Sequence, residues 1–433
     1  MSGLLRICTA GSVDDGKSTL IGRLLYDSRS VYEDQVSSVE KASKNLATGP
    51  IDFSLFTDGL RAEREQGITI DVAYRYFATA NRKFILADTP GHEQYTRNMA
   101  TGASTADLAI LLIDARQGVR VQSRRHAHIA RLLGIKDYVL AVNKMDLVGF
   151  DPEVFEGIVD EFDRILPEAN LHAIPLSALH GDNVITKSDR TPWFSGAPLL
   201  PFLEAVHVHR DDAAKPFRFA VQLVLRPSDD FRGYAGQVAS GSIKPGDAVT
   251  IWPSGRTSHV VRIVTWDGDV HRASAGMSVT LTLADEIDVS RGDVLAVGQP
   301  EVGHRFLADV VWMDERALDP SRVYLLKHTT RTVGAEVDHP LVLNQIGRVA
   351  VRTTRPLIFD RYAENRVTGS FILIDAVTNF TAGAGMIVGP LDHEIKAATT
   401  PSAAERLARL AREATSDDAA IEAVRTALEE LLT

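Results

Sequence analysis

The chain has 433 residues, of which 45% are hydrophobic and 24% are charged, with 31 Gly and 18 Pro. These values are typical of globular proteins and exclude a collagen, a coiled coil and an intrinsically disordered chain. The formal charge of −10, from 47 Lys and Arg against 57 Asp and Glu, weighs against a nonspecific nucleic-acid binder. We therefore expect no nucleic-acid partner and, at roughly 150 residues per domain, two to four domains.

The cysteine content and the absence of long apolar runs bear on the compartment. The single cysteine, Cys8, cannot form an internal disulfide, which favours a reducing environment. The N-terminus has no signal-peptide pattern, and no apolar run approaches the ~18 residues of a membrane span. We expect a cytoplasmic protein without membrane contact.

The first two hundred residues alternate short apolar segments with amphipathic helical patterns. This alternation predicts a mostly parallel, helix-covered sheet over residues 1–208. Ligands of such sheets bind at the carboxyl ends of the strands, so chemistry is expected in the loops that follow them. The predicted strands are Leu4–Ala10, Lys83–Ala87, Leu108–Ile113, Tyr138–Val142 and Leu171–Pro175.

After a polar connector at 208–215, short β-rich runs are separated by Gly-Asp and Pro-Gly turns. This texture predicts two small antiparallel β-barrel domains, at 216–300 and 301–392. A capping-box pattern at Ser402–Glu405 then begins a short C-terminal helical tail at 400–433, with an apolar stripe that packs on its own barrel or docks on a partner. The arginine-rich stretch Arg116–Arg131 is expected to be a solvated helix face, with contact to a partner as the alternative.

A glycine-rich loop follows the first predicted strand and precedes a helical pattern. Its sequence matches GxxxxGK[ST], in which backbone N–H groups and a helix N-terminus bind phosphates. Lys17 is expected to bridge the β- and γ-phosphates, and the Ser18 hydroxyl to bind Mg²⁺. The predicted contacts are Gly11, Ser12, Val13, Asp14, Asp15, Gly16, Lys17, Ser18 and Thr19.

A second motif, Asp88, Thr89, Pro90, Gly91 and His92, follows the next predicted strand. Asp88 is placed to hold Mg²⁺ through water, and the Gly91 N–H to sense a γ-phosphate. Thr69, on the loop between the two motifs, is a candidate second hydroxyl ligand of Mg²⁺.

Two further loops predict recognition of a guanine base. Asn143, Lys144, Met145 and Asp146 follow the strand Tyr138–Val142, and Ser177, Ala178 and Leu179 follow the last predicted strand. A carboxylate at Asp146 accepts from the N1–H and exocyclic amine of guanine, a donor pair that adenine lacks. The ordered motifs predict an α/β P-loop GTPase domain that binds GTP or GDP with Mg²⁺.

His92 stands directly after Asp-Thr-Pro-Gly, where a residue that orients the attacking water is needed. We expect His92 to be the catalytic residue. Val13 and Ile68 are candidates for a hydrophobic gate that holds His92 away from the water until a partner engages. The alternative is that both are ordinary packed apolar residues.

A GTPase domain with this histidine, followed by two β domains, resembles the translation elongation factor superfamily. Elongation factors of the Tu type usually have His at the positions of Ser12 and Asp15, so this loop differs from them. The variant loop, the stretches Thr57–Arg75 and Gln94–Met99, and the motifs Lys327–Arg331 and Asn365–Asp375 are similar to those of the GTPase subunits of bacterial sulfate adenylyltransferase, the CysN type.

That resemblance implies a hetero-oligomer in which a catalytic subunit of the CysD type joins ATP and sulfate into adenosine 5′-phosphosulfate and pyrophosphate, driven by GTP hydrolysis. No second phosphate-binding motif follows Pro390, so any adenylylsulfate kinase is expected to be a separate protein. Two alternatives stay open. One is a translation factor that delivers aminoacyl-tRNA, and the other is a general regulatory GTPase.

Overall fold

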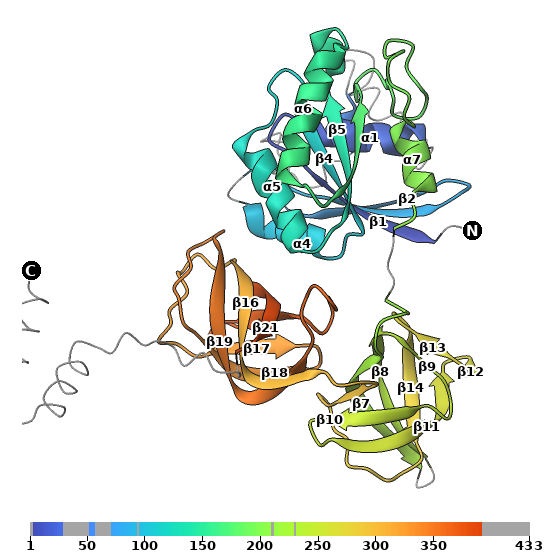
Figure 1. Cartoon of the computed structure of the whole chain (residues 1–433), viewed down its shortest axis with the longest axis vertical. Coiled ribbons are helices and arrows are strands. Elements are labelled where there is room, and N and C mark those ends of the chain that lie inside the picture. Colours follow the sequence, from blue (N-terminus) through green and yellow to red (C-terminus); the bar gives the residue numbers. More distant parts are fainter. Residues whose placement is uncertain are drawn as a thin grey trace, which may run out of the picture.

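The computed structural model describes residues 3–28, 52–56, 71–92, 95–208, 212–228 and 231–391. Thr69, Ile68 and the tail at 400–433 lie outside these residues. Within them the chain forms an N-terminal α/β domain, a first β domain and a second β domain (Figure 1). No helix in these ranges is long and apolar enough to cross a membrane.

The α/β domain is built on a six-stranded sheet with the order β2-β3-β1-β4-β5-β6. All neighbours are parallel except β2 and β3, which are antiparallel. The five predicted strands are confirmed within a residue or two at their ends. The strands are β1 (Leu4–Ala10), β2 (Ala73–Ala78), β3 (Lys83–Asp88), β4 (Leu108–Asp114), β5 (Asp137–Asn143) and β6 (Asn170–Pro175).

Helices cover both faces of this sheet and bury two separate cores. One core lies under α1 and α7; the other lies under α4, α5 and α6 and also takes in Val311, Tyr362 and Met386 of the second β domain. Apolar burial on both faces explains why the central strands are near-continuous apolar runs. The helices are α1 (Lys17–Asp27), α4 (Thr96–Ser104), α5 (Val121–Leu132), α6 (Pro152–Ile165) and α7 (Leu199–Ala205), with 3₁₀ turns η1 (Phe53–Phe56) and η3 (Met145–Val148).

The first β domain is an antiparallel sheet with the order β10-β15-β7-β8-β14-β11-β12, and a further pairing of β10 with β11 joins its two sides. Strands β9 and β13 form a separate pair beside it. The bounds are β7 (Arg218–Ser228), β8 (Phe231–Ser240), β9 (Ser242–Ile243), β10 (Ala248–Trp252), β11 (Arg256–Thr265), β12 (Gly268–Asp269), β13 (Ala273–Ser274), β14 (Ser278–Leu283) and β15 (Val294–Ala296).

The second β domain is a closed barrel of six strands with the order β16-β19-β18-β17-β20-β21. Closure removes the free edges that an open sheet would expose. The bounds are β16 (Glu301–Trp312), β17 (Tyr324–His328), β18 (Arg331–Val337), β19 (Ile346–Phe359), β20 (Ser370–Ile374) and β21 (Thr381–Pro390).

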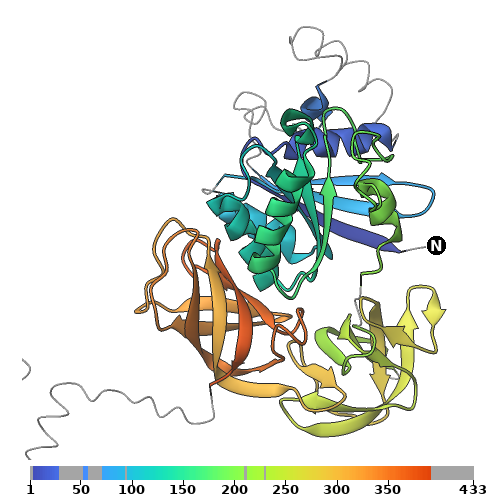
Figure 2. The same ribbon diagram turned by 45° about the horizontal axis from the view of Figure 1, so that its top comes forward.

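The loop between β19 and β20, residues 360–369, contacts both other domains, and we call it the junction segment. Towards the first β domain, Asp360 pairs with Arg218 at 3.0 Å, and Asn365 donates to the Ser240 hydroxyl at 2.9 Å. Towards the α/β domain, the Tyr362 hydroxyl donates to the carbonyl of Leu133 at 3.0 Å. Figure 2 shows the second β domain (orange to red) below the helices and beside the first β domain (green to yellow).

The arginines of the Arg116–Arg131 stretch are largely exposed, as expected from its charge, but the half-buried Arg125 also contacts another domain. Arg125 of α5 donates to the carbonyl of Asn344 in the second β domain at 3.0 Å. Arg97 of α4 reaches the carbonyl of Met313 in the same domain at 3.4 Å. The face of α4 and α5 is therefore a contact surface between domains, which charge alone does not indicate.

Candidate nucleotide-binding site

The predicted motifs converge at the carboxyl edge of the parallel sheet. Thr9 of β1 is opposite Asp88 of β3, and Asp114 of β4 is opposite Asn143 of β5. Because parallel strands in register end at the same edge, their following loops become neighbours. Motifs that are far apart in the sequence thus lie together in one site.

Two glycines allow the loops to approach more closely than any side chain would permit. Gly16 has φ +91°, and a Cβ there would collide with the side-chain amide of Asn143. A Cβ on Gly91 would lie 2.6 Å from the carbonyl oxygen of Gly11 and would also collide with the Lys17 ammonium. These positions require glycine for steric reasons.

The Lys17 ammonium lies across the glycine-rich loop. It donates to the carbonyl oxygens of Gly11 at 2.8 Å and Ser12 at 2.9 Å and is buried. Burial lowers the pKa of Lys17, and the carboxylates of Asp88, Asp15 and Asp14 oppose that shift. The loop therefore holds a desolvated cation at the N-terminus of α1, where anions are favoured.

The two positions that set this loop apart from Tu-type factors are in direct contact. The buried carboxylate of Asp15 accepts the Ser12 N–H at 2.5 Å. Burial raises the pKa of Asp15, while the Lys17 charge and the Ser12 N–H oppose the shift. The Ser12 hydroxyl is buried without a hydrogen-bond partner among the described residues. The Asp15 carboxylate thus holds the main chain of Ser12 in place within the loop.

The Asp88–His92 loop packs against β1. Asp88, Thr89, Pro90 and Gly91 are buried, and Asp88 accepts from the Thr9 hydroxyl at 3.4 Å. His92 is half-buried, with its ring centroid 6.0 Å from that of Tyr95. Val13, Ser18 and Thr19 of the glycine-rich loop are also half-buried. Val13 lies within the glycine-rich loop and His92 ends the Asp88–His92 loop, while Ile68 and Thr69 fall outside the described residues.

Asn143 ties the phosphate-binding loop to the base-recognition loops. Its amide donates to the carbonyl of Asp15 at 2.8 Å, and its oxygen accepts the Ala178 N–H at 2.9 Å. Lys144 donates to the Asp14 carbonyl, and the buried Met145 bonds the Leu176 carbonyl through its N–H at 3.2 Å. The structure therefore brings together the Asn143–Asp146 and Ser177–Leu179 loops and the glycine-rich loop.

Asp146 and Leu179 stand at the open side of this arrangement. The Asp146 side chain is 12% exposed and lies 3.7 Å from the imidazole of His180, a residue that the motifs did not single out. Leu179 is exposed, and its carbonyl accepts from Arg23 of α1 at 3.3 Å. His180 and Arg23 therefore border the region where a base would bind Asp146.

Asp114 is the main site residue that the sequence analysis missed. It ends β4 with a fully buried carboxylate that pairs with Lys144 at 3.0 Å and Arg116 at 2.6 Å. Burial raises the pKa of Asp114, but hydrogen bonds from Arg116 and Lys144 outweigh burial and hold it at about 2. An acidic residue directly after a wholly apolar strand is the sequence signal that marks this position.

The oxygen-bearing side chains of the site match the ligands that Mg²⁺ prefers. Mg²⁺ keeps several waters and takes one or two protein oxygens in addition to phosphate oxygens, rather than a cage of side chains. In the ranges the structure covers, no group of three His, Cys, Asp or Glu side chains forms such a cage. The carboxylate of Asp88, whose charge opposes the lowering of the Lys17 pKa by burial, and the Ser18 hydroxyl at the start of α1 are the kind of sparse oxygen set that fits.

The chain is similar to known families and proteins over most of its length. The Elongation factor Tu GTP binding domain matches residues 2–212, and the GTP-eEF1A C-terminal domain-like family matches residues 335–388. Sulfate adenylyltransferase subunit 1 of Bacteroides thetaiotaomicron is 53% identical, over 92% of this chain and 88% of its own length. The same-named protein of Aeromonas hydrophila is 55% identical, over 89% and 86%.

Two other matches differ in extent. Bifunctional enzyme NodQ of a Rhizobium species is 54% identical over 90% of this chain, which spans 64% of that protein. Among solved structures, sup35 complexed with GDP aligns with a TM-score of 0.40 and 24% identity, covering 90% of this chain and 95% of that one.

Proposed function

Because this chain belongs to the family of sulfate adenylyltransferase subunit 1, we propose that it is the GTP-hydrolysing subunit of that enzyme. Its partner is then a separate catalytic subunit of the CysD type, which forms adenosine 5′-phosphosulfate and pyrophosphate from ATP and sulfate. The observation that carries the GTPase part is the buried Lys17 ammonium inside a glycine-rich loop that Asn143 connects to the base-recognition loops.

The residues divide the nucleotide between them. Lys17 and the N–H groups of residues 11–19 bind the phosphates, while Asp146 accepts from guanine and Ser177, Ala178 and Leu179 border the base. Lys144 positions this part of the site because it contacts both the Asp14 carbonyl and the buried Asp114. Ser18 and Asp88, the latter through water, would hold Mg²⁺, which neutralises phosphate charge when bound.

His92 is the residue that we assign to the hydrolytic step. It follows Gly91, which packs on the carbonyl of Gly11 and therefore lies at the phosphate end of the site. Phosphoryl transfer needs mainly positioning and electrostatic stabilisation, and a half-buried imidazole at this end of the site can orient a water for attack.

The chemistry of sulfate activation explains why a GTPase is coupled to it. A phosphosulfate anhydride is less stable than the phosphate anhydride that is consumed, so the adenylyl transfer needs a second exergonic reaction. Coupling requires two conformations that differ in their interactions with nucleotide and partner. The contacts of α4 and α5, which adjoin the His92 loop, with the second β domain offer a physical connection between hydrolysis and the rest of the chain.

The proposal is tested with the purified chain and its cognate catalytic subunit. GTP hydrolysis and pyrophosphate release are measured in parallel, with the chain alone and mixed, with and without ATP plus sulfate. We expect stimulated GTP hydrolysis accompanied by GTP-dependent pyrophosphate release. A GTP hydrolysis rate that is unchanged by this subunit but raised by ribosomes would contradict the proposal and favour aminoacyl-tRNA delivery.

A His92→Ala variant separates binding from hydrolysis in the same assay. It should retain GTP affinity and complex formation, whereas GTP turnover falls by about two to four orders of magnitude. Unchanged turnover would assign the hydrolytic step to another residue or to the partner.

A further inference from the structure

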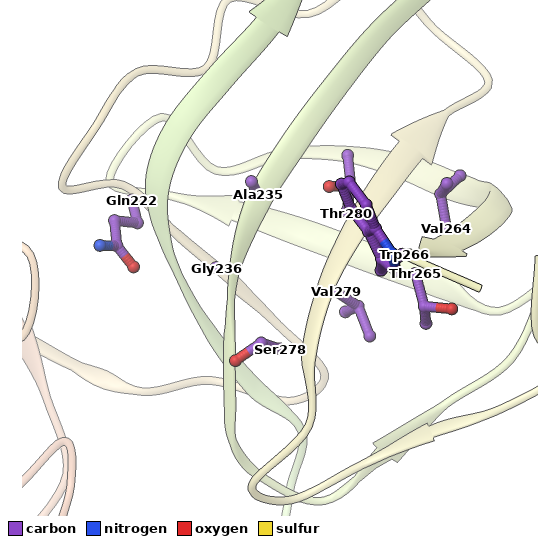
Figure 3. Close-up of a pocket in the computed structure, with 9 residues that line it drawn as sticks. All are labelled: Gln222, Ala235, Gly236, Val264, Thr265, Trp266, Ser278, Val279 and Thr280. Atoms are coloured by element: carbon purple, nitrogen blue, oxygen red, sulfur yellow. The ribbon is translucent and has the colours of Figure 1, made fainter. Parts of the chain in front are cut away.

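A hollow of about 370 Å³ lies on the first β domain, on the outer side of strands β7, β8, β11 and β14. Its floor is made of small residues, chiefly Ala235, Gly236, Ser278 and Thr280. Figure 3 shows Gln222 on one side of β8 and Trp266, with Val264 and Thr265, on the other. Small residues between two tall side chains leave room for one inserted side chain.

Trp266 is the most exposed of the large apolar residues in this part of the molecule. Its side chain is 100% exposed, whereas Trp312 is 1% exposed and Trp193 and Trp252 are half-buried. A fully exposed tryptophan forgoes a large hydrophobic contribution, and tryptophan is enriched among the residues that dominate binding at protein interfaces. Its position at the wall of a hollow makes it suited to close over an inserted group.

The charges around the hollow constrain what enters it. None of the nine lining side chains is ionisable, so the floor favours an uncharged group. Beside it, the exposed Arg291 donates to the main-chain carbonyl of Gln222 at 3.2 Å and places a guanidinium at the rim. Arg262, on the other side, is already paired with Asp269 at 2.7 Å. The complementary occupant is an apolar side chain with a carboxylate nearby in its segment.

We propose that this hollow anchors the partner subunit, which inserts an apolar side chain between Trp266 and Gln222 and places an acidic residue against Arg291. The inference rests on the proposed function, since that function requires a second subunit. It adds the surface and the chemistry of the contact. The site lies on a different domain from the nucleotide loops, so partner binding and GTP binding can be tested independently.

The test measures the dissociation constant of the complex between the full chain and the cognate catalytic subunit. Trp266→Ala removes the wall, and Ser278→Arg fills the floor from an exposed position, where a longer side chain meets no core. Each should weaken the complex at least about tenfold, as loss of a central anchor does. Arg291→Ala should weaken it less and reduce its salt dependence.

The matched control is Phe380→Ala, which removes another exposed aromatic side chain, 74% exposed, from the second β domain. It should leave the dissociation constant within about twofold, and GTP affinity should be unchanged in all four variants. Complexes of wild-type strength with both Trp266→Ala and Ser278→Arg would overturn the inference while leaving the proposed function intact. A wild-type chain that forms no complex would overturn both.

Acrylamide quenching of Trp266 fluorescence distinguishes two other occupants of the hollow, the chain's own C-terminal segment and a second copy of the chain. The Trp266→Phe variant isolates the Trp266 signal. We expect quenching in the free chain and protection once the catalytic subunit is added. Protection in the free chain that is lost on deleting residues 392–433 would assign the hollow to the chain's own C-terminal segment. Protection that instead rises with the concentration of the chain alone would assign it to a second copy. Either result overturns the inference.

Discussion

The nucleotide loops and the junction segment are both buried polar regions, but they are assembled differently. The nucleotide site is built from motifs that each follow a strand of one parallel sheet, so the sheet register aligns them. The junction segment gathers groups from three domains, among them Arg218, Leu133 and its own Asp360. The polar groups of the nucleotide loops are arranged for a ligand, whereas those at the junction segment form hydrogen bonds and an ion pair with one another. Mutations should therefore impair binding in the first and stability in the second.

The largest expected effect on stability is at the junction. Arg218 and Asp360 form an ion pair whose side chains are 5% and 12% exposed, and Asp360 also accepts from the Thr368 hydroxyl at 2.6 Å. Arg218→Met leaves a buried carboxylate without its cation, which should lower the free energy of unfolding by about 3–5 kcal/mol. Chemical denaturation of the full chain, followed by a signal from the β domains, measures this free energy. GTP affinity should be unchanged.

A double variant controls for loss of side-chain volume. Arg218→Met combined with Asp360→Asn removes the uncompensated charge and should recover part of the lost stability. Equal stability of the single and double variants would show that packing, rather than charge, holds this contact.

Lys17→Ala should have the opposite effect to Arg218→Met, because it should reduce GTP affinity and leave stability unchanged. Removing the ammonium eliminates two charge-assisted contacts with phosphates, each of about 1.5 kcal/mol, so GTP affinity should fall at least ~100-fold. The fold should persist, because within the described residues the Lys17 ammonium donates to the carbonyls of Gly11 and Ser12, which belong to its own loop. Calorimetric titration with GTP measures the affinity. Retained tight binding would refute the phosphate-binding assignment.

The sequence predicted the nucleotide loops because their information is local. A glycine with positive φ, a lysine and a strand end are all visible within about ten residues, as at Gly16 and Lys17. The edge strand β2 was missed, since Tyr74 and Tyr76 are exposed and its burial alternates instead of forming an apolar run. Arg366, singled out only as part of a family motif, binds the carbonyls of Ala106 and Gly134, more than 200 residues away. Contacts of that separation have no local signal.

Base specificity tests Asp146, which lies at the open side of the site. Asp146→Asn replaces an acceptor by an amide that can also donate, so the preference should move from GTP towards xanthosine triphosphate. Loss of one hydrogen bond to a charged group, about 1.5–3 kcal/mol, corresponds to a change of roughly 10- to 150-fold in GTP affinity. Competition between the two nucleotides measures the ratio. A variant that still prefers GTP would move base recognition away from Asp146.

His126 of α5 should make the α/β domain sensitive to acid. Burial lowers the pKa of His126 to about 3, and the positive charges of Lys17 and Arg125 act in the same direction. Below pH ~6.5 the unfolded chain binds a proton that the folded chain does not, so stability falls as the pH falls towards 3. At pH ~5 the loss is about 2 kcal/mol, from 1.36 kcal/mol per pH unit.

His126→Gln should remove this contribution. The difference in unfolding free energy between pH ~7 and pH ~5 should then be about 2 kcal/mol smaller than in the unmodified chain. If the two pH profiles are parallel, the folded-state pKa of His126 is near its ordinary value and the imidazole is not as buried as the structure has it.

The smallest effect is expected at the contact between the junction segment and the α/β domain. Tyr362→Phe removes only the hydroxyl that donates to the Leu133 carbonyl at 3.0 Å, a bond worth about 1 kcal/mol. Tyr324→Phe is the matched control, because its buried hydroxyl accepts the Asp319 N–H at 3.0 Å inside one domain. Both variants should lose similar stability, but only Tyr362→Phe should increase hydrogen exchange at residues 133–134. Equal exchange in the two variants would mean that the aromatic ring of Tyr362, packed in the core under α5, holds the domains together without its hydroxyl.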